Sequence, residues 1–164
     1  MLLNIKKYTL LDVRIALYQP DIPQNTGNIC RLAACFNIPV EIIEPIGFFM
    51  DSQKFRRSAM DYYKFTKIKR HIDWNSFYDW AKNNNYRLVL LTTKGKKKYT
   101  SYKFRKNDLI IFGRESAGMP KKLHGVMDER LVIPIKKNLR SLNISSAVAI
   151  TIGECMRQLK FFWQ

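Results

Sequence analysis

The C-terminal third of the chain contains the stretch that decides the fold. Asp108-Leu-Ile-Ile-Phe112 runs into Gly113-Arg-Glu-Ser-Ala-Gly118, and a second apolar run, Arg130-Leu-Val-Ile-Pro-Ile135, runs into Asn138-Leu-Arg-Ser-Leu-Asn143. A helical pattern begins at about Ser145. Short apolar runs closed by turn residues are typical of buried strands. Because ligands of open α/β sheets bind at the carboxyl ends of the strands, these two polar turns predict a ligand site there.

Outward from this stretch, strand and helix patterns alternate along the chain. Period-2 and apolar runs predict strands at 14–18, 40–43, 65–69, 87–91, 108–112 and 130–135, with 65–69 at an edge. Helical spacing predicts helices from 25 to about 36 and over 54–62, 74–84 and 145–160. This alternation indicates an α/β fold with a mostly parallel sheet flanked by helices. A length of 164 residues without a Gly-, Ser- or Pro-rich linker predicts a single domain, 14–164, preceded by an N-terminal extension, 1–13.

The charge of the chain is strongly positive and unevenly distributed. The sequence has 29 Lys and Arg against 13 Asp and Glu, a formal net charge of +16. Residues 52–106 hold 16 of the 29 basic residues and only three acidic ones. This concentration favours a polyanionic partner such as nucleic acid. The alternative is an AT-rich genome that enriches Lys and Asn at the surface, and the clustering weakens it.

Cysteine and histidine usage argues against disulfides and metal sites. The three cysteines, Cys30, Cys35 and Cys155, are an odd number and lie in apolar-periodic segments, which predicts buried thiols in a reducing compartment. Two histidines and no Cys-x-x-Cys motif predict no metal. The N-terminal apolar run is broken by charges, and no run of about 18 apolar residues occurs, so we expect no signal peptide, no membrane association and a cytoplasmic protein, or a nuclear or organellar one in a eukaryote.

Three polar residues share one side of the first predicted helix. Asn25, Asn28 and Arg31 are spaced i, i+3 and i+6, opposite the apolar face. Two amides and one arginine suit hydrogen bonding to a phosphate or a ribose. The alternative is that Asn25 is an ordinary helix cap and the other two are unrelated surface residues.

The two polar turns contain further candidate ligand-binding residues. The 113–118 turn matches neither a P-loop nor a dinucleotide fingerprint, but its glycines allow close approach of the backbone to a ligand. Glu115 is either part of that site, a capping residue or a salt-bridge partner of Arg114. Before the last helix, one cap residue would suffice. Four candidates are present, and the excess favours a ligand: Ser141, Asn143, Ser145 and Ser146.

Residues 94–106 combine cations with aromatic rings. Lys94, Lys96, Lys97 and Lys98 come first, and the rings of Tyr99, Tyr102 and Phe104 then alternate with the cations Lys103, Arg105 and Lys106. Cations neutralise phosphates and rings stack on unpaired bases, so the segment is a candidate RNA-binding loop. The alternative is a solvated loop without a partner.

Several motifs in this order resemble one family. They are Pro23-Gln-Asn-Thr-Gly-Asn-Ile-Cys-Arg31, Arg56-Arg57 with Asp61-Tyr62, Leu91-Thr-Thr-Lys-Gly95, Phe112-Gly-Arg-Glu-Ser-Ala-Gly118, and the stretch from Ile133 to Val148 that contains Asn-x-Arg-Ser-Leu-Asn-Ile-Ser-Ser. From Arg14 to about Phe161 the chain resembles the SpoU/TrmH class of the SPOUT methyltransferase superfamily. It looks most like the short members, called TrmL, which 2′-O-methylate the ribose of tRNA nucleotide 34.

The resemblance implies an α/β fold with a C-terminal trefoil knot, a homodimer whose active site uses both chains, and S-adenosylmethionine bound at the knot. By position, the implied cofactor-binding residues are Leu91, Gly113, Ile133 and Ser141. The implied catalytic set is Arg31, Asn25, Glu115, Ser141 and Asn143. We expect tRNA to be contacted by Arg56, Arg57, Lys94, Lys96, Lys97 and Lys98. Because the pKa of a free arginine exceeds about 12, we interpret Arg31 as an orienting cation in preference to a base.

Two positions depart from the family pattern. Where TrmL members usually read Gly-Pro-Glu-Thr-Arg-Gly, this chain has Arg114 early and Ala117 late in the turn. Gly153 replaces a usual tyrosine on the last helix, which indicates either close approach of another backbone or a different dimer contact. The alternatives are 2′-O-methylation of another tRNA or rRNA position, and a non-catalytic RNA-binding protein with the same fold.

Overall fold

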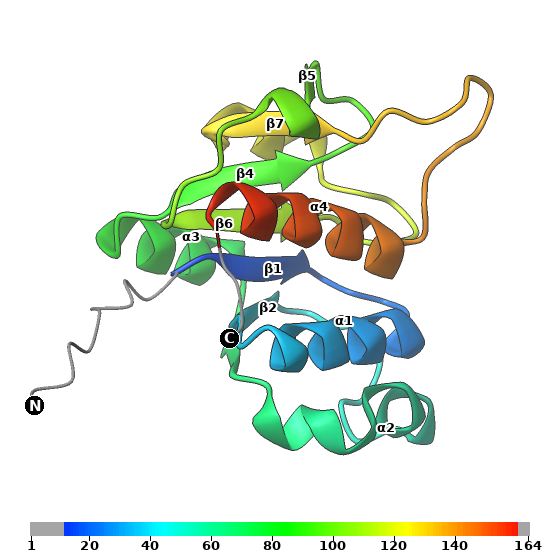
Figure 1. Cartoon of the computed structure of the whole chain (residues 1–164). Coiled ribbons are helices and arrows are strands. Elements are labelled where there is room, and N and C mark those ends of the chain that lie inside the picture. The colour runs from blue at the N-terminus through cyan, green and yellow to red at the C-terminus, as the bar shows by residue number, and fades with distance from the viewer. Residues whose placement is uncertain (1–11, 161–164) are drawn as a thin grey trace, which may run out of the picture.

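A computed structural model describes residues 12–160 and has one sheet with all strand pairs parallel. The order across the sheet is β3-β2-β1-β6-β4-β7-β5 (Figure 1). The strands are β1 (Arg14–Tyr18), β2 (Val40–Ile43), β3 (Ile68–His71), β4 (Arg87–Leu91), β5 (Lys97–Lys98), β6 (Asp108–Phe112) and β7 (Glu129–Val132). The predicted α/β class, the parallel sheet and its edge strand β3 are confirmed.

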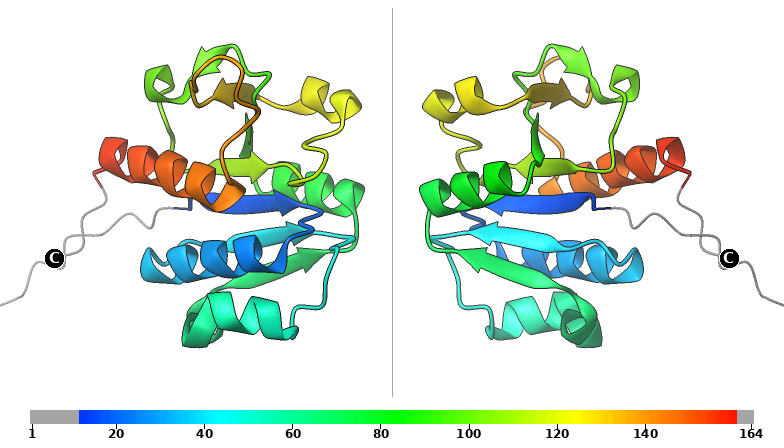
Figure 2. Two further views of the ribbon diagram at one scale, coloured as in Figure 1. Left: turned by 90° about the vertical axis from the view of Figure 1, so that its right-hand side faces the viewer. Right: turned by 90° about the vertical axis from the view of Figure 1, so that its left-hand side faces the viewer.

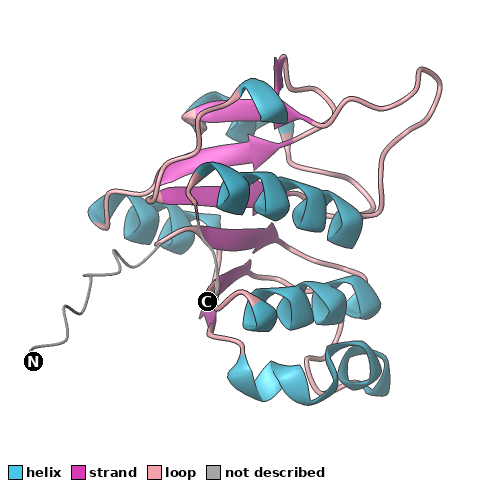
Figure 3. Ribbon diagram, viewed as in Figure 1, coloured by secondary structure: helices cyan, strands magenta, loops and turns pink. Residues whose placement is uncertain are grey.

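Helices cover both faces of the sheet (Figures 2 and 3). One face carries α1 (Pro23–Cys35) and α4 (Ile144–Gln158), which pack with Ile15 and Leu17 of β1 in one core. The other face carries α3 (Trp74–Asn83), which packs with Ala16 in a second core. Side chains of a strand alternate between faces, so one strand supplies both cores. The remaining elements are α2 (Gln53–Ala59) and three 3₁₀ segments, η1 (Met60–Phe65), η2 (Tyr99–Ser101) and η3 (Lys121–Val126).

Several boundaries differ from the sequence-based ones for local reasons. The second helix ends at Ala59, not at residue 62, because Met60 adopts a positive φ of 52° and a 3₁₀ segment follows. Strand β3 begins three residues later than predicted, after η1 has used residues 60–65. Strand β7 ends at Val132, so residues 133–135 leave the sheet and enter the loop before α4. None of the helices in residues 12–160 is long and apolar enough to cross a membrane.

The cysteine prediction is right for two residues and wrong for one. Cys30 and Cys155 are buried, and burial raises the pKa of each thiol to about 12. Cys35 is exposed at the last residue of α1. Cys35 lies off the apolar side of α1, whose members Ile29, Ala33 and Phe36 pack in the core.

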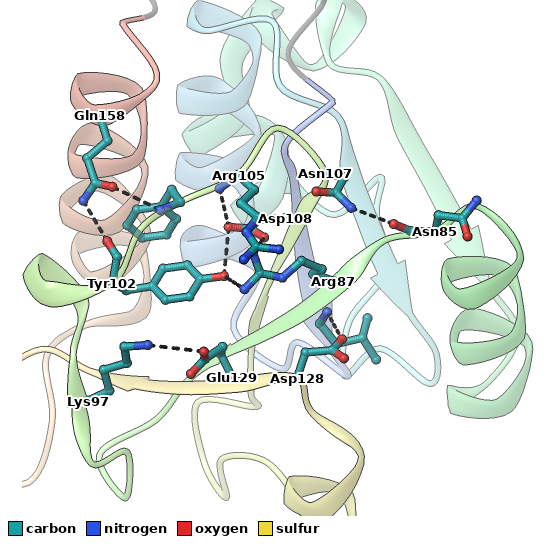
Figure 4. Close-up of polar contacts among 12 residues, drawn as sticks. Asn85, Arg87, Lys97, Tyr102, Arg105, Asn107, Asp108, Asp128, Glu129 and Gln158 are labelled. Carbon is teal, nitrogen blue, oxygen red and sulfur yellow. Dashed lines mark hydrogen bonds and ion pairs between the residues drawn. The ribbon is translucent and has the colours of Figure 1, made fainter.

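Two aromatic residues of the 94–106 segment are core residues, which corrects their predicted role in base stacking. Tyr102 is 2% exposed and Phe104 is 6% exposed. The amide of Gln158 on α4 binds this backbone twice, donating to the Tyr102 carbonyl (2.9 Å) and accepting from the Phe104 N–H (3.0 Å) (Figure 4). These two rings therefore attach the segment to the domain, while its lysines and Arg105 are exposed and Tyr99 is half-buried.

The Tyr102 hydroxyl bridges two charges at the amino end of the strands (Figure 4). It accepts a hydrogen bond from Arg87 Nη2 (2.6 Å) and donates to Asp108 Oδ2 (3.1 Å), which also accepts from the Arg105 N–H (2.8 Å). Asp108 is fully buried, and this burial raises the pKa of its carboxyl despite the nearby donors and the Arg87 charge. The same burial raises the pKa of the Tyr102 hydroxyl.

We expect Tyr102→Phe to lower the free energy of unfolding by about 1–3 kcal/mol, because it removes a bridging donor and leaves a buried carboxylate less satisfied. Urea denaturation measures the change. The matched control is Tyr99→Phe, since no hydrogen bond of the Tyr99 hydroxyl occurs in the part of the chain that the structure describes. Equal stabilities of the two variants would contradict the bridging role.

Candidate active site

A cleft of about 660 Å³ opens at the carboxyl ends of β4, β6 and β7. Such a volume is usual for a pocket that holds a small organic ligand. Residues from five segments line it: Leu91 to Lys94 at the end of β4, Phe112 to Met119 at the end of β6, His124 of η3, Ile133, Ile135, Arg140 to Ile144 and Ala147 around the start of α4, and Ile22 and Asn25 at the start of α1. The predicted candidates Ser145 and Ser146 are not among the lining residues. The predicted ligand site at this edge of the sheet is therefore present as a cleft.

The turn after β6 depends on its two glycines. A Cβ at Gly113 would lie 2.5 Å from the Met119 nitrogen and 2.6 Å from the Gly118 carbonyl carbon, so no larger residue fits. Gly118 has a φ of +68°, a conformation that L side chains rarely adopt, and its N–H donates to the Arg114 carbonyl (2.7 Å). The turn closes on itself and lines the cleft with its backbone.

A chain of hydrogen bonds brings three predicted site residues together. Asn143 Nδ2 donates to Asn25 Oδ1 (2.9 Å), and Asn25 Nδ2 donates to Glu115 Oε1 (3.2 Å). Asn143 Oδ1 accepts from the N–H of Ser145 (2.8 Å), so Asn143 also caps α4. Asn25 is buried. It is not the N-cap of α1, because α1 begins at Pro23 and the residue in the N-cap position is Ile22. The capping alternative is thus right for Asn143 and wrong for Asn25.

Glu115 has a partner that sequence reasoning missed. Its Oε2 accepts from the backbone N–H of Asp21 (3.1 Å), and the Ser116 hydroxyl donates to the Asp21 carboxylate. Burial raises the pKa of Glu115, and hydrogen bonding to the Asp21 carboxyl raises it further. Burial also acts to raise the pKa of Asp21, but hydrogen bonds from Glu115 and Ser116 and the charge of Arg114 outweigh it, so that pKa is lowered. The sequence contained one indication of this contact. Asp21 follows the end of β1 and Glu115 follows the end of β6, and the carboxyl ends of parallel strands lie at the same edge of a sheet.

Arg114 does not bind Glu115 among the contacts of residues 12–160, so the salt-bridge alternative is wrong. Its guanidinium donates to Gln19, through Nη2 to the side-chain oxygen (2.8 Å) and through Nε to the carbonyl (3.4 Å). Arg114 therefore ties the turn after β6 to the end of β1.

The four predicted cofactor-binding residues all line the cleft: Leu91, Gly113, Ile133 and Ser141. The predicted catalytic residues Asn25, Glu115 and Asn143 line it as well. Arg31 does not. It is exposed on α1 with its guanidinium carbon 5.1 Å from the centre of the Tyr62 ring and Nη1 3.5 Å from Met60 Sδ. Arg31 lies six residues after Asn25 on α1. Its side chain points to η1, whereas Asn25 lines the cleft.

The predicted RNA-binding cations form two groups, not one patch. Arg56 and Arg57 are exposed on α2, beside α1 near the β3 edge of the sheet, and Lys94, Lys96, Lys97 and Lys98 lie around β5 at the opposite edge (Figure 1). Lys94 lines the cleft. Lys97 pairs with Glu129 (3.3 Å). The cleft opens between the two groups, at the carboxyl ends of the central strands.

Comparison with known proteins places the chain among RNA methylases. The SpoU rRNA Methylase family matches residues 12–153, and the chain belongs to this family. A tRNA (cytidine(34)-2′-O)-methyltransferase of Beijerinckia indica is 46% identical over 145 residues, which cover 88% of this chain and 91% of that protein. The Escherichia coli K12 protein of the same name is 38% identical over a match that covers 91% of this chain and 95% of that protein. The C-terminal trefoil knot is implied by membership of the family.

Solved structures agree with this assignment. A structure described as giving insights into the 2-OH methylation of C/U34 on tRNA has a TM-score of 0.86 and 33% identity, and the match covers 90% of this chain and 96% of that one. The SpoU methyltransferase AviRb of Streptomyces viridochromogenes, in complex with the cofactor AdoMet, has a TM-score of 0.84 at 21% identity and shares the fold. This chain covers 60% of AviRb.

We expect Asn143→Ser and Asn143→Ala to separate the two roles of Asn143. Serine can still cap α4 but does not reach Asn25, so the unfolding free energy should stay near wild type while methyl transfer falls about tenfold, the equivalent of about 1.4 kcal/mol. Alanine removes both roles and should also cost about 1 kcal/mol of stability. Thermal unfolding and single-turnover methylation measure the two effects. Wild-type activity in the serine variant would show that the link to Asn25 is dispensable.

Proposed function

We propose that the chain is an S-adenosylmethionine-dependent 2′-O-methyltransferase that acts on a tRNA ribose, most specifically that of nucleotide 34. The observation that carries the proposal is the convergence of Asn25, Glu115, Ser141 and Asn143 on one cleft in a chain that belongs to an RNA methylase family. The names of relatives at 38–46% identity support nucleotide 34.

The residues of the cleft fit S-adenosylmethionine. Apolar side chains suit an adenine ring, and the backbone of the 113–118 turn and the 140–143 loop suits its polar edges. Leu91, Phe112, Ile133 and Leu142 supply the apolar side chains. The bound donor supplies an activated methyl group. The protein has to hold the ribose oxygen in line with that methyl, exclude water and receive a proton, and positioning alone can supply much of the acceleration.

A homodimer would complete the site. Arg31 points away from the cleft of its own chain, so it can serve the reaction from the cleft of a second copy, related by a two-fold axis. Helices α1 and α4 are neighbours, and their outer surface is available for contact with a second copy of the chain. On this surface the side chain of Ile150 is 39% exposed. Gly153 on α4 is exposed, and a Cβ there would meet no atom of residues 12–160 within 4 Å. Close approach of another backbone segment of the same chain therefore does not explain why position 153 is glycine. Of the two explanations, a changed dimer contact is the one that remains.

The tRNA would lie across both groups of cations. The cations of α2 have exposed aromatic neighbours in η1, where Tyr63 is 43% exposed and Phe65 is 73% exposed. Rings beside cations suit unpaired bases, such as those of an anticodon loop. The alternative of rRNA methylation is less favoured, because this chain covers 57% of the AdoMet-bound rRNA methyltransferase of Sinorhizobium meliloti but 96% of the C/U34 structure.

The direct test is mass spectrometry of nuclease-digested tRNA transcripts after incubation with the protein and S-adenosylmethionine. We expect one 2′-O-methyl group, at nucleotide 34. Methylation of another tRNA position or of rRNA fragments would identify the alternative enzyme, and S-adenosylmethionine binding without any methylation would indicate the non-catalytic RNA-binding protein.

For Arg31, we expect Arg31→Ala to abolish methyl transfer while leaving the fold and S-adenosylmethionine affinity nearly unchanged, because Arg31 lies outside the cleft of its own chain. Arg31→Lys keeps the charge but loses the planar fork that holds an oxygen in two places. If Arg31 orients the substrate, lysine should be nearly as inactive as alanine. A lysine variant with substantial turnover that rises with pH would indicate a base, since a lysine pKa is about 10.4.

Salt dependence of tRNA binding should separate the two groups of cations. Each phosphate contact contributes about 0.9 to the slope of log K against log salt on a duplex and about 0.7 on a single strand. We expect replacement of Lys96, Lys97 and Lys98 by Ala to flatten the slope, and Arg56→Ala with Arg57→Ala to do so independently. Filter binding at several salt concentrations measures both, with cofactor affinity as the control. An unchanged slope for either set would mean that it does not contact phosphate.

A further inference from the structure

Three large apolar residues are exposed at the carboxyl edge of the sheet, beside the cleft. Ile22 follows β1, Phe49 follows β2 and Ile72 follows β3, and they are 41%, 81% and 81% exposed. The three strands are neighbours in the sheet, and β1 pairs with β6, whose turn lines the cleft. Because parallel strands end at one edge, these residues form a ledge that begins at Ile22 in the cleft wall and leads toward β3.

A chain of polar contacts ties the same strand ends together. Arg114 Nη2 donates to the side chain of Gln19 (2.8 Å), and Gln19 Nε2 donates to the Glu44 carbonyl (3.3 Å). The Glu44 carboxylate in turn accepts from Arg70 of β3. The ends of β6, β1, β2 and β3 are thereby joined, with an arginine at each end of the chain of contacts.

The loop between β2 and α2 displays Phe49 because its neighbours pack inward. The Phe48 ring stacks on Phe55 with ring centres 6.1 Å apart, and Met50 packs against the apolar core. The Phe49 carbonyl accepts from the N–H of Ser52 (2.9 Å), the N-cap residue of α2. The exposed ring is therefore carried by a backbone that is held on both sides.

The same loop is pressed against the loop that enters the cleft. The Gly47 N–H donates to the Pro20 carbonyl (2.9 Å), and a Cβ at Gly47 would lie 2.9 Å from the Asp21 Cα. Two residues of chain span about 7 Å at most. Phe49 therefore lies near the loop that carries Ile22 into the cleft wall.

The chemistry of the ledge suits the faces of unpaired bases. Rings and apolar side chains stack on bases that are splayed out of a loop, whereas a duplex presents its backbone and base edges. Cations for the phosphates are nearby, since Arg70 and Lys54 are exposed and Arg114 lines the cleft. Two acids, Asp51 and Asp73, are exposed beside the ledge, and their charge disfavours phosphates on the ledge itself. Uncharged base faces are the part of an RNA strand that fits there.

We propose that the ledge of Ile22, Phe49 and Ile72 binds the unpaired nucleotides next to the methylated one, with the Phe49 ring stacked on a base. The inference rests on the proposed function, and it names the substrate class as a loop or single strand of RNA, not a duplex. The nucleotide to be methylated enters the cleft past Ile22, while its neighbours leave along Phe49. The ledge thus determines specificity and takes no part in the chemical step.

The affinity for a hairpin RNA whose loop contains the target cytidine tests the ledge. We expect Phe49→Ser to weaken binding about tenfold, the equivalent of about 1.4 kcal/mol, because one base loses its stacking partner. The slope of log K against log salt should not change, since the ring carries no charge. Phe49→Trp should bind like the wild type, and Ile72→Ser should weaken binding less than Phe49→Ser. The matched control is Val126→Ser, an exposed apolar residue of η3. Wild-type affinity in Phe49→Ser would overturn the proposal.

Abasic nucleotides placed one at a time beside the target cytidine identify the stacked base. In the wild type, one abasic position should weaken binding about tenfold. In Phe49→Ser the same position should have no further effect, because the two changes remove one contact. Losses that multiply at every position would show that Phe49 and the bases act independently, which would overturn the proposal.

Sedimentation and methylation separate the ledge from the dimer and from the proposed function. Phe49→Ser should keep the sedimentation coefficient, the thermal unfolding and the S-adenosylmethionine affinity of the wild type, because the residue is exposed. Dissociation of a dimer by this change would assign the ledge to a second copy of the chain and overturn the proposal. Methylation of nucleotide 34 by the wild type with unchanged binding in Phe49→Ser would overturn the ledge alone. Coupled losses at one abasic position without methylation of any RNA would refute the proposed function and leave the ledge standing.

Discussion

The parallel direction of all seven strands is the constraint on which the rest of the structure depends. Parallel strands place their carboxyl ends at one edge, so the turns after β1, β4, β6 and β7 meet although they are far apart in the sequence. The chain of hydrogen bonds from Asn143 through Asn25 to Glu115 spans separations of 118 and 90 residues. Asn25, Asn143 and Glu115 are thus each held by a group from another segment, and Leu91 and Phe112 join the cleft to the apolar core.

Buried charge also joins neighbouring strands away from the cleft. Glu41 is fully buried and binds Arg14 Nη1 (2.8 Å) and His71 Nε2 (2.7 Å), which joins β1, β2 and β3. Asp108 and Arg87 join β6 and β4 through Tyr102. Removing one partner of such a group leaves an unsatisfied buried charge, so these contacts stabilise the domain and position the 94–106 segment.

Electrostatics link the cleft to its expected substrate. Two groups of exposed cations lie toward opposite edges of the sheet, Lys94 of one group lines the cleft, and Glu115 is the one acidic side chain among the described lining residues. A polyanion is attracted to the surrounding surface and to Lys94, Arg114 and Arg140 in the lining of the cleft. The position of Arg31 beside Tyr62 adds a cation that a second copy of the chain could share.

The sequence by itself determined the elements and most of the cleft. Apolar periodicity is a local property, so β1, β2, β4, β6 and all four helices were predicted within a few residues. Glycines and polar residues that follow strands, such as Gly113 and Ser141, were predicted at the ligand edge because strand direction decides where they lie. Only the tertiary structure decided that Tyr102 and Phe104 are buried, that Arg31 turns to η1 and that Asp21 meets Glu115. Those outcomes depend on contacts between segments distant in sequence, and the residue types alone are compatible with either a solvated or a packed position.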